Sequence, residues 1–155
     1  MTLAESAPVP VAAVPEYDQD FFLWTQYTAA LLREGRFGDL DVAHLAEEIE
    51  DMGKRDRREV ESRLELLLIH LLKWHGQADR RSDSWRRTIA TQRAELERAL
   101  RDSPSLRRWA EGDIGRHYTA AVRRAAQETR LPAAHFPPTC PWGLAQLLDE
   151  TIVPE

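Results

Sequence analysis

The chain has 155 residues, one cysteine and a formal net charge of −5. A chain of this length buries roughly two-thirds of its unfolded surface on folding, so it needs neither a metal nor a disulfide for stability. Cys140 has no partner within the chain, which excludes an intrachain disulfide and is typical of a reducing compartment. We therefore expect a cytoplasmic protein. No apolar run approaches the ~20 residues of a membrane span, so we expect no membrane partner.

The composition favours an all-α fold. Leu and Ala together number 39, whereas the β-branched Val and Ile together number 12. Small and straight-chain residues favour helices, and β-branched residues favour strands. No proline lies between residues 16 and 103, and no sustained apolar–polar alternation typical of strands is present. The sequence predicts a helical bundle of about five helices, with residues 1–16 as a flexible N-terminal arm and residues 17–155 as a single helical domain.

The charges are segregated along the chain. Residues 1–51 carry a net charge of −9, residues 52–130 carry +7, and residues 131–155 carry −3. Such segregation has two interpretations. Either the acidic ends neutralise the basic middle of the chain, or the basic middle faces an acidic partner such as nucleic acid.

The first helix is predicted between residues 18 and 34. Asp18 is suited to cap its first turn, and Gly35 is a typical helix stop. Apolar and small side chains recur at helical spacing along this segment and predict its buried face. They are Phe21, Trp24, Thr28, Leu31 and Leu32.

The longest predicted helix begins near Asp39 or Asp41, continues to His75 and is bipartite. Its first apolar stripe is Val42, Leu45, Ile49 and Met52, and its second is Val60, Leu64, Leu67, Leu68, Leu71, Leu72 and Trp74. An unbroken helix of this length would span ~50 Å, whereas a compact domain of this size is ~40 Å across. Either the helix bends near Gly53, or one end leaves its own domain and buries its stripe on another subunit. The second alternative indicates a dimer.

Three further helices complete the predicted bundle. One begins near residue 82 or 84 and ends near 101, the next runs from 104 to 129 with Ser103 as its cap, and a short one follows Pro141. The five tryptophans fall one per helical segment, which predicts a shared core with an aromatic anchor on each helix. They are Trp24, Trp74, Trp85, Trp109 and Trp142.

An acidic block that contains a histidine is the first candidate site. His44, Glu48 and Asp51 follow i, i+4, i+7 spacing on one helical face, and carboxylates with an imidazole bind divalent metals. The simpler interpretation is a solvated acidic face that pairs with nearby Arg and Lys, and an interface is a third. The candidate metal ligands are His44, Glu47, Glu48 and Asp51. No cofactor is predicted.

The segment RRSDSWRR at residues 80–87 places four arginines around one tryptophan at a helix start. Free amides at a helix start bind phosphate, and arginines with an aromatic ring serve nucleic acid. The simpler interpretation is that a serine caps the helix, Trp85 packs inward and the arginines pair with the acidic block. His70 is interpreted as a core member or as the polar floor of a pocket. The candidate ligand site consists of His70, Trp74, Arg80, Arg81, Ser82, Trp85 and Arg86.

Several blocks in a fixed order resemble a known bacterial family. They are LAEEIEDMG (45–53), LLIHLLKWHGQ (67–77), RRSDSWRRTIATQR (80–93), SPSL (103–106), and the closing FPPTCPW with LLDE (147–150). Their succession resembles the domain-of-unknown-function family number twenty-nine over residues 17 to 154. The resemblance implies an all-helical bundle. It implies no activity and no catalytic residues, because none is established for that family.

The chain lacks the motifs of the common enzyme classes. It has no Gly-rich phosphate loop, no G-x-S-x-G, no H-E-x-x-H and no paired cysteines. We therefore expect a non-catalytic interaction or scaffold module that self-associates, with a dimer as the expected homo-oligomer and a different protein partner as an open alternative. Two other functions stay open: a binder of nucleic acid or a phosphate ligand through residues 80–87, and a metal- or ligand-dependent enzyme of unknown reaction.

Overall fold

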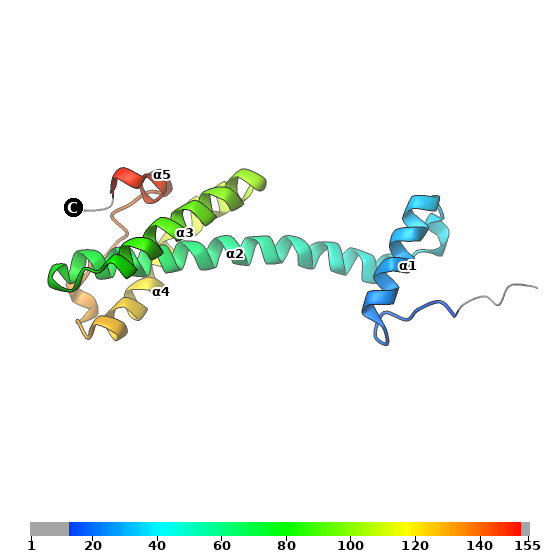
Figure 1. The fold of residues 1–155 in the computed structure, drawn as a ribbon, viewed down its shortest axis with the longest axis horizontal. Helices are drawn as coiled ribbons and strands as arrows, with labels where there is room; N and C mark the ends of the chain where they lie inside the picture. Colours follow the sequence, from blue (N-terminus) through cyan, green and yellow to red (C-terminus); the bar gives the residue numbers. More distant parts are fainter. Residues whose placement is uncertain (1–12, 153–155) are drawn as a thin grey trace, which may run out of the picture. The chain divides into compact units, whose positions relative to one another are not determined.

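The structure of the protein is a computed structural model that describes residues 13–152. Within that range the regular elements are all helical and no strand is present, which confirms the all-α prediction (Figure 1). Contacts divide the chain into two compact units, one up to Met52 and one from Gly53, and we describe each by itself. Most of the predicted arm, residues 1–12, lies outside the described residues. The single domain over residues 17–155 stays a prediction.

Five α-helices and four short 3-10 helices make up the described chain. The α-helices are α1 (Phe21–Glu34), α2 (Val42–Gly76), α3 (Asp83–Asp102), α4 (Leu106–Thr129) and α5 (Leu144–Leu148). The 3-10 helices are η1 (Phe37–Asp39), η2 (Ala78–Arg80), η3 (Ala133–His135) and η4 (Glu150–Ile152). The polar run at 53–59 is helical throughout, so α2 is the long bipartite helix that the sequence predicts. None of the helices described is long and apolar enough to cross a membrane.

Both ends of α1 and the start of α3 follow local capping chemistry, whereas α4 begins at Leu106 after Ser105, which makes no side-chain cap hydrogen bond, so the predicted Ser103 cap is wrong. Asp20, not Asp18, caps α1, because its Oδ1 accepts a hydrogen bond from the backbone N–H of Leu23 at 2.9 Å. Gly35 ends α1 with φ 71°, in the left-handed region that favours glycine. Ser82 caps α3 by accepting from the backbone N–H of Trp85 at 3.3 Å, as one of the two predicted alternatives has it.

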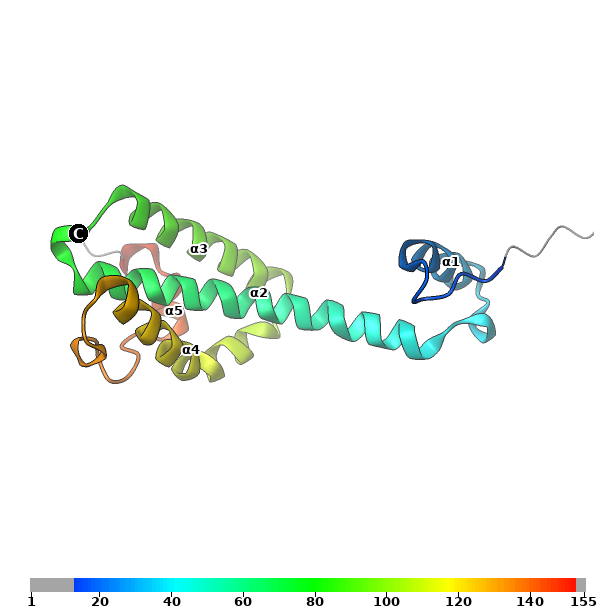
Figure 2. The ribbon, with the colours of Figure 1, turned by 90° about the horizontal axis from the view of Figure 1, so that it is seen from below.

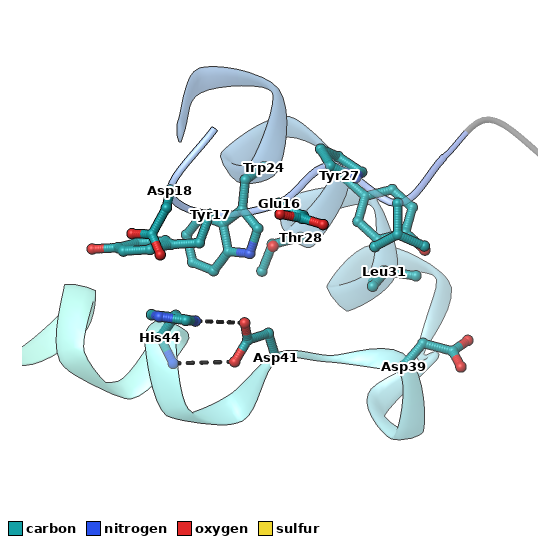
Figure 3. Close-up of a pocket in the computed structure, with 12 residues that line it drawn as sticks. Glu16, Tyr17, Asp18, Trp24, Tyr27, Thr28, Leu31, Asp39, Asp41 and His44 are labelled. Atoms are coloured by element: carbon teal, nitrogen blue, oxygen red, sulfur yellow. Dashed lines mark hydrogen bonds and ion pairs between the residues drawn. The ribbon is translucent and has the colours of Figure 1, made fainter. Parts of the chain in front are cut away.

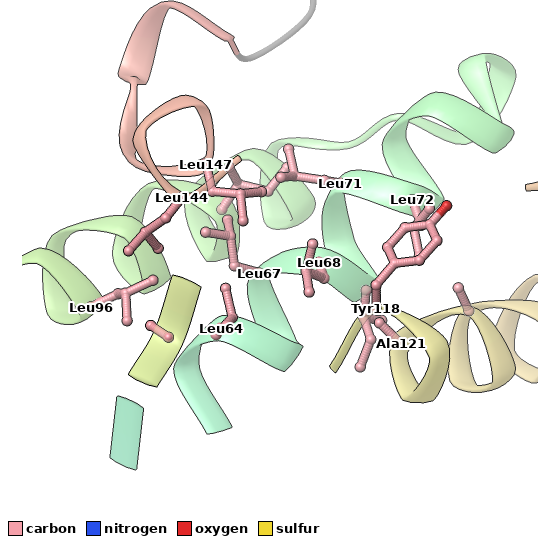
Figure 4. Packing of buried hydrophobic residues seen from close by; sticks show 14 of the residues in the cluster. Leu64, Leu67, Leu68, Leu71, Leu72, Leu96, Tyr118, Ala121, Leu144 and Leu147 are labelled. Carbon is pink, nitrogen blue, oxygen red and sulfur yellow. The ribbon is translucent and has the colours of Figure 1, made fainter. Parts of the chain in front are cut away.

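Unit 2 holds the large apolar core. From residue 53 on, α2 is flanked by α3, which runs antiparallel to it, and by α4, which returns alongside (Figure 2). The second stripe of α2 is buried as predicted, and α5 adds Leu144 and Leu147 to the same cluster (Figure 4). Each fully buried Leu contributes roughly 1.5–3 kcal/mol relative to an exposed one. The stripe members in that core are Val60, Leu64, Leu67, Leu68, Leu71, Leu72 and Trp74.

Trp109 departs from the predicted tryptophan core. It is an exposed residue of α4, and the guanidinium of Arg57 lies over its ring at 4.0 Å from the centroid. Ala110, the next residue, occupies the inward position of that turn. The prediction of one tryptophan anchor per helix is therefore wrong for α4, because neighbouring positions on a helix point about 100° apart.

Unit 1 has a much smaller core. Its buried side chains among residues 13–52 are Trp24, Thr28 and Leu31, all from α1. The predicted α1 face also included Phe21 and Leu32, which are exposed. The apolar residues Val42, Ile49 and Met52 at the start of α2 are exposed as well. This short unit thus leaves much of its apolar surface uncovered.

Candidate functional site

A pocket of about 300 Å³ opens in unit 1, between the segment before α1, α1 itself, η1 and the start of α2 (Figure 3). Its volume lies at the lower end of the range typical of small-molecule sites. Aromatic rings, carboxylates and one imidazole line it. The lining residues that matter most are Tyr17, Asp18, Trp24, Tyr27, Thr28 and His44.

His44, one of the predicted metal ligands, lies at the edge of this pocket and binds Asp41. Its Nδ1 is 2.6 Å from Oδ2 of Asp41, and its backbone N–H donates to Oδ1 of the same carboxylate at 3.3 Å. Asp41 directly precedes α2, so spacing of three residues brings the two side chains together. The hydrogen bond raises the pKa of His44 and lowers the pKa of Asp41. This pair therefore favours the imidazolium–carboxylate form.

Tyr17 connects the segment before α1 to α2. Its ring stacks on that of His44 with centroids 4.1 Å apart and meets Trp24 edge-on at 5.0 Å. Its hydroxyl donates to Oε1 of Glu48 at 2.5 Å, and this bond raises the pKa of Tyr17 to about 12. The neutral phenol is thus held across the side of the pocket.

The predicted metal ligands lie along the first turns of α2 but face different partners. His44 binds Asp41, and Glu48 accepts from Tyr17. Glu47 is exposed and Asp51 is half-buried. A metal held by these four residues stays a prediction.

A second group of side chains that are able to bind a metal lies in unit 2, at residues that the sequence did not predict as a site. One ligand atom each from Glu61, Asp113 and His117 falls within 4.8 Å of the others, and His117 is buried. Two arginines already bind these carboxylates: Arg57 Nε lies 2.9 Å from Glu61, and Arg116 Nη2 lies 2.9 Å from Asp113. The group is therefore an ion-pair network between α2 and α4. The only sequence signal was the four-residue spacing of Asp113 and His117.

Part of the predicted ligand site forms a cluster of arginines on a tryptophan. Trp74 is buried, and the guanidinium groups of Arg81 and Arg86 lie 5.1 and 5.4 Å from its ring centroid. Arg81 Nε also donates to the backbone oxygen of Trp74 at 3.0 Å. These two arginines thus stack on the core tryptophan and fasten the loop that precedes α3.

The remaining residues of that predicted site serve other contacts. Trp85 is half-buried below Nζ of Lys73, 4.8 Å from the ring centroid, and Arg80 is exposed at the end of η2. His70 is half-buried, and its Nδ1 is 3.0 Å from the backbone oxygen of Leu66. Burial lowers the pKa of His70. A role of the segment in ligand binding stays a prediction.

Comparisons with known proteins give one match. Residues 16–153 match the family described as domain of unknown function DUF29. Neither the comparison with curated proteins nor that with solved structures found a match. The matched range takes in ten of the twelve residues that line the pocket of unit 1 and all five described α-helices, which confirms the resemblance noted in the sequence. With one family profile covering nearly its whole length, the chain belongs to the DUF29 family.

Proposed function

We propose that this protein is a non-catalytic interaction module that associates with a second copy of itself. The observation that supports the proposal is the concentration of exposed apolar side chains in unit 1. Of the ten large apolar side chains exposed in the described chain, nine lie before Gly53. We call eight of them the exposed apolar set: Phe21, Phe22, Leu23, Leu32, Phe37, Val42, Ile49 and Met52.

The exposed apolar set is large enough to be compared with the area that one partner buries in a protein–protein interface. Single exposed apolar residues are normal on a soluble protein, but a concentration of them marks an interaction surface. The three phenylalanines of the set offer on the order of 150–250 Å² each, so their exposed fractions of 48%, 74% and 64% leave roughly 280–470 Å² uncovered, to which the five aliphatic members add. A standard interface buries about 800 Å² per partner. Burial of most of the set would therefore supply a large part of such an interface.

Charge complementarity favours a second copy as the partner. Residues 13–52 carry ten acidic and two basic side chains, whereas residues 53–152, the described part of unit 2, carry 19 basic and 14 acidic side chains, a net charge of +5. Each chain thus offers both an acidic and a basic surface. Two copies that meet acidic to basic gain favourable long-range attraction and the correct orientation.

The experiment is a light-scattering measurement of molar mass on the full chain and on Ile49→Lys. Ile49 is 60% exposed, so a lysine there has little effect on the fold of one chain. In a dimer it would bury a charge within an apolar contact, so we expect the variant to be monomeric. Ala43→Lys is the matched control, because Ala43 is exposed on α2 and points about 120° away from Ile49.

Two results would contradict the proposal. One is the mass of a single chain for the unchanged protein at every concentration tested. The other is an unchanged dimer in Ile49→Lys and in a second variant, Met52→Lys, with circular dichroism showing the same helix content. A dimer lost equally in Ala43→Lys would place the contact on another face of α2 and would likewise overturn the proposed surface.

A further inference from the structure

We infer that the unit 1 pocket binds an organic cation: a guanidinium or alkylammonium group whose carrier also has a carbonyl oxygen, as arginine and lysine residues do. This inference does not depend on self-association. It follows from three properties of the lining, which are its charge, its aromatic faces and a buried donor without an acceptor.

The pocket lining is acidic. Glu16, Asp18, Asp39 and Asp41 all lie on it. Asp39 pairs with Arg36 at 2.7 Å, and Asp41 pairs with His44. Asp18 is exposed beside Tyr17 and makes no ion pair within residues 13–152 (Figure 3). The hydrogen bond to Asp41 and, to a smaller extent, the charge of Asp18 raise the pKa of His44, which lines the same pocket. The lining therefore repels anions and holds at least one carboxylate available to a cation.

Aromatic rings complement this charge. His44 covers one face of Tyr17 and Trp24 is almost fully buried, so the half-buried Tyr27 offers the most accessible ring. Tyr17, Trp24 and Tyr27 line the same pocket, with Leu31 as an apolar surface below them (Figure 3). Cations attach to the faces of such rings, and guanidinium groups also stack on them. An inorganic cation would gain nothing from Leu31, whereas the aliphatic stem of an arginine or lysine would pack against it.

Two buried polar groups add a requirement for hydrogen bonding. Trp24 and Thr28 are only 4% and 5% exposed, and both line the pocket. No residue in the described chain accepts the indole N–H of Trp24 or bonds to the hydroxyl of Thr28. The indole nitrogen is drawn toward the middle of the pocket in Figure 3. Indole N–H is a donor only, and that of Trp24 is not sealed from solvent, so water can bond to it in the open pocket. An acceptor oxygen on a ligand would take the place of that water.

Together the three properties specify the ligand. The carboxylates and rings select a cationic head, and the free indole N–H selects an acceptor oxygen on the same molecule. A simple amine satisfies the first requirement but not the second. An amidated amino acid or a basic residue within a peptide satisfies both.

The test follows the indole N–H signal of Trp24 in ¹⁵N-labelled full chain by NMR. The chain has five tryptophans, and Trp24→Phe identifies the signal by its loss. The probe is Nα-acetyl-arginine amide, and the control ligand is Nα-acetyl-citrulline amide, which has nearly the same shape without the charge. We expect the chemical shift of this signal to change and to reach a plateau as the arginine probe is added. The citrulline probe should bind at least about tenfold more weakly. A signal that does not shift with the arginine probe, or equal affinities for the arginine and citrulline probes, would overturn the proposed cation site.

Matched variants separate binding from folding. Asp18→Asn should weaken binding of the arginine probe by about tenfold. Glu47→Gln removes an exposed charge that is not on the pocket lining, although it acts on Tyr17 and His44 from outside, and should weaken binding much less. Trp24→Phe removes the N–H, so the affinity should fall, but it also shrinks one of the three buried side chains of unit 1, so the melting temperature should fall as well. Asp18→Asn changes an exposed side chain and is therefore the variant that separates binding from folding. Equal affinities in Asp18→Asn and Glu47→Gln would overturn the assignment.

A final arm distinguishes the two sources of the cation. A five-residue peptide with arginine at the centre of four alanines carries the same head on a longer backbone. Tighter binding of this peptide than of the single amide assigns the pocket to a segment of a protein partner. Equal affinity assigns it to a free small cation, and failure of both probes to bind overturns the inference.

Discussion

Arg93 of α3 is a buried cation whose replacement by an apolar residue should stabilise the protein. It is 2% exposed, and its Nε donates to the backbone oxygen of Leu147 at 2.7 Å. Its two Nη atoms are sealed from solvent and have no hydrogen-bond partner in residues 13–152. Burial lowers the pKa of Arg93, and the charges of Asp149 and Glu150 act in the opposite direction. The guanidinium is thus only partly compensated.

The sign of the effect follows from the opposing contributions. Arg93→Met loses one charge-assisted hydrogen bond, worth about 1.5–3 kcal/mol. It also removes two unsatisfied donor groups, each costing about 1–3 kcal/mol, and leaves an aliphatic chain of similar length. We therefore expect a gain of about 1 kcal/mol in the free energy of unfolding, or about 3 °C in melting temperature.

The assay is urea unfolding followed by circular dichroism, with Leu96→Ala as the control on the same helix. Leu96 is fully buried, so its truncation should cost about 2–5 kcal/mol. A decrease of more than about 2 kcal/mol in the free energy of unfolding of Arg93→Met would contradict the claim that the buried guanidinium is only partly compensated. It would show that the Nη groups do have strong partners and that Arg93 fastens α5 to α3.

Two further predictions concern α2. Burial lowers the pKa of His70 in the folded state, so the unfolded chain binds the proton first as the pH falls below about 6.5. The contribution of His70 to stability is therefore present above that pH and is lost as the pH falls. His70→Gln should reduce the loss of unfolding free energy between pH 7 and pH 5. The same dependence of unfolding free energy on pH in the variant and the unchanged protein would contradict this. A Cβ added to Gly53 meets no atom within 4 Å, whereas one on Gly76 meets Phe136 Cε1 at 3.1 Å. Gly53→Ala should thus raise the free energy of unfolding through helix propensity, by up to about 1 kcal/mol, and Gly76→Ala should gain less or lose stability. Equal gains in both variants would contradict the packing of Phe136.

Periodicity was sufficient to predict the core of unit 2. Residues 60–74 of α2 repeat large apolar side chains so densely that one face has to be buried, and the structure buries it. The same reasoning failed for Phe21 and Leu32, because a pattern indicates that a face favours burial but not which element covers it. The cap of α1 moved from Asp18 to Asp20 because residues 17–19 form a turn instead.

The pocket of unit 1 could be predicted only in part. The spacing of Asp41 and His44 within one turn is a local signal that the sequence contained. The contacts of Tyr17 with Trp24 and Glu48 join segments up to 31 residues apart, and no periodicity reports such a contact. For the same reason the network of Glu61 and Asp113 appears only once α4 lies beside α2.

We propose that a second copy of the chain covers the exposed apolar set. Sedimentation equilibrium of the unmodified chain tests it most directly, because the method reports mass independently of shape. We predict twice the 17.8 kDa of one chain at moderate salt, with Ile49→Lys at the mass of a single chain. A mass of 17.8 kDa for the unmodified chain up to millimolar concentration would contradict the claim.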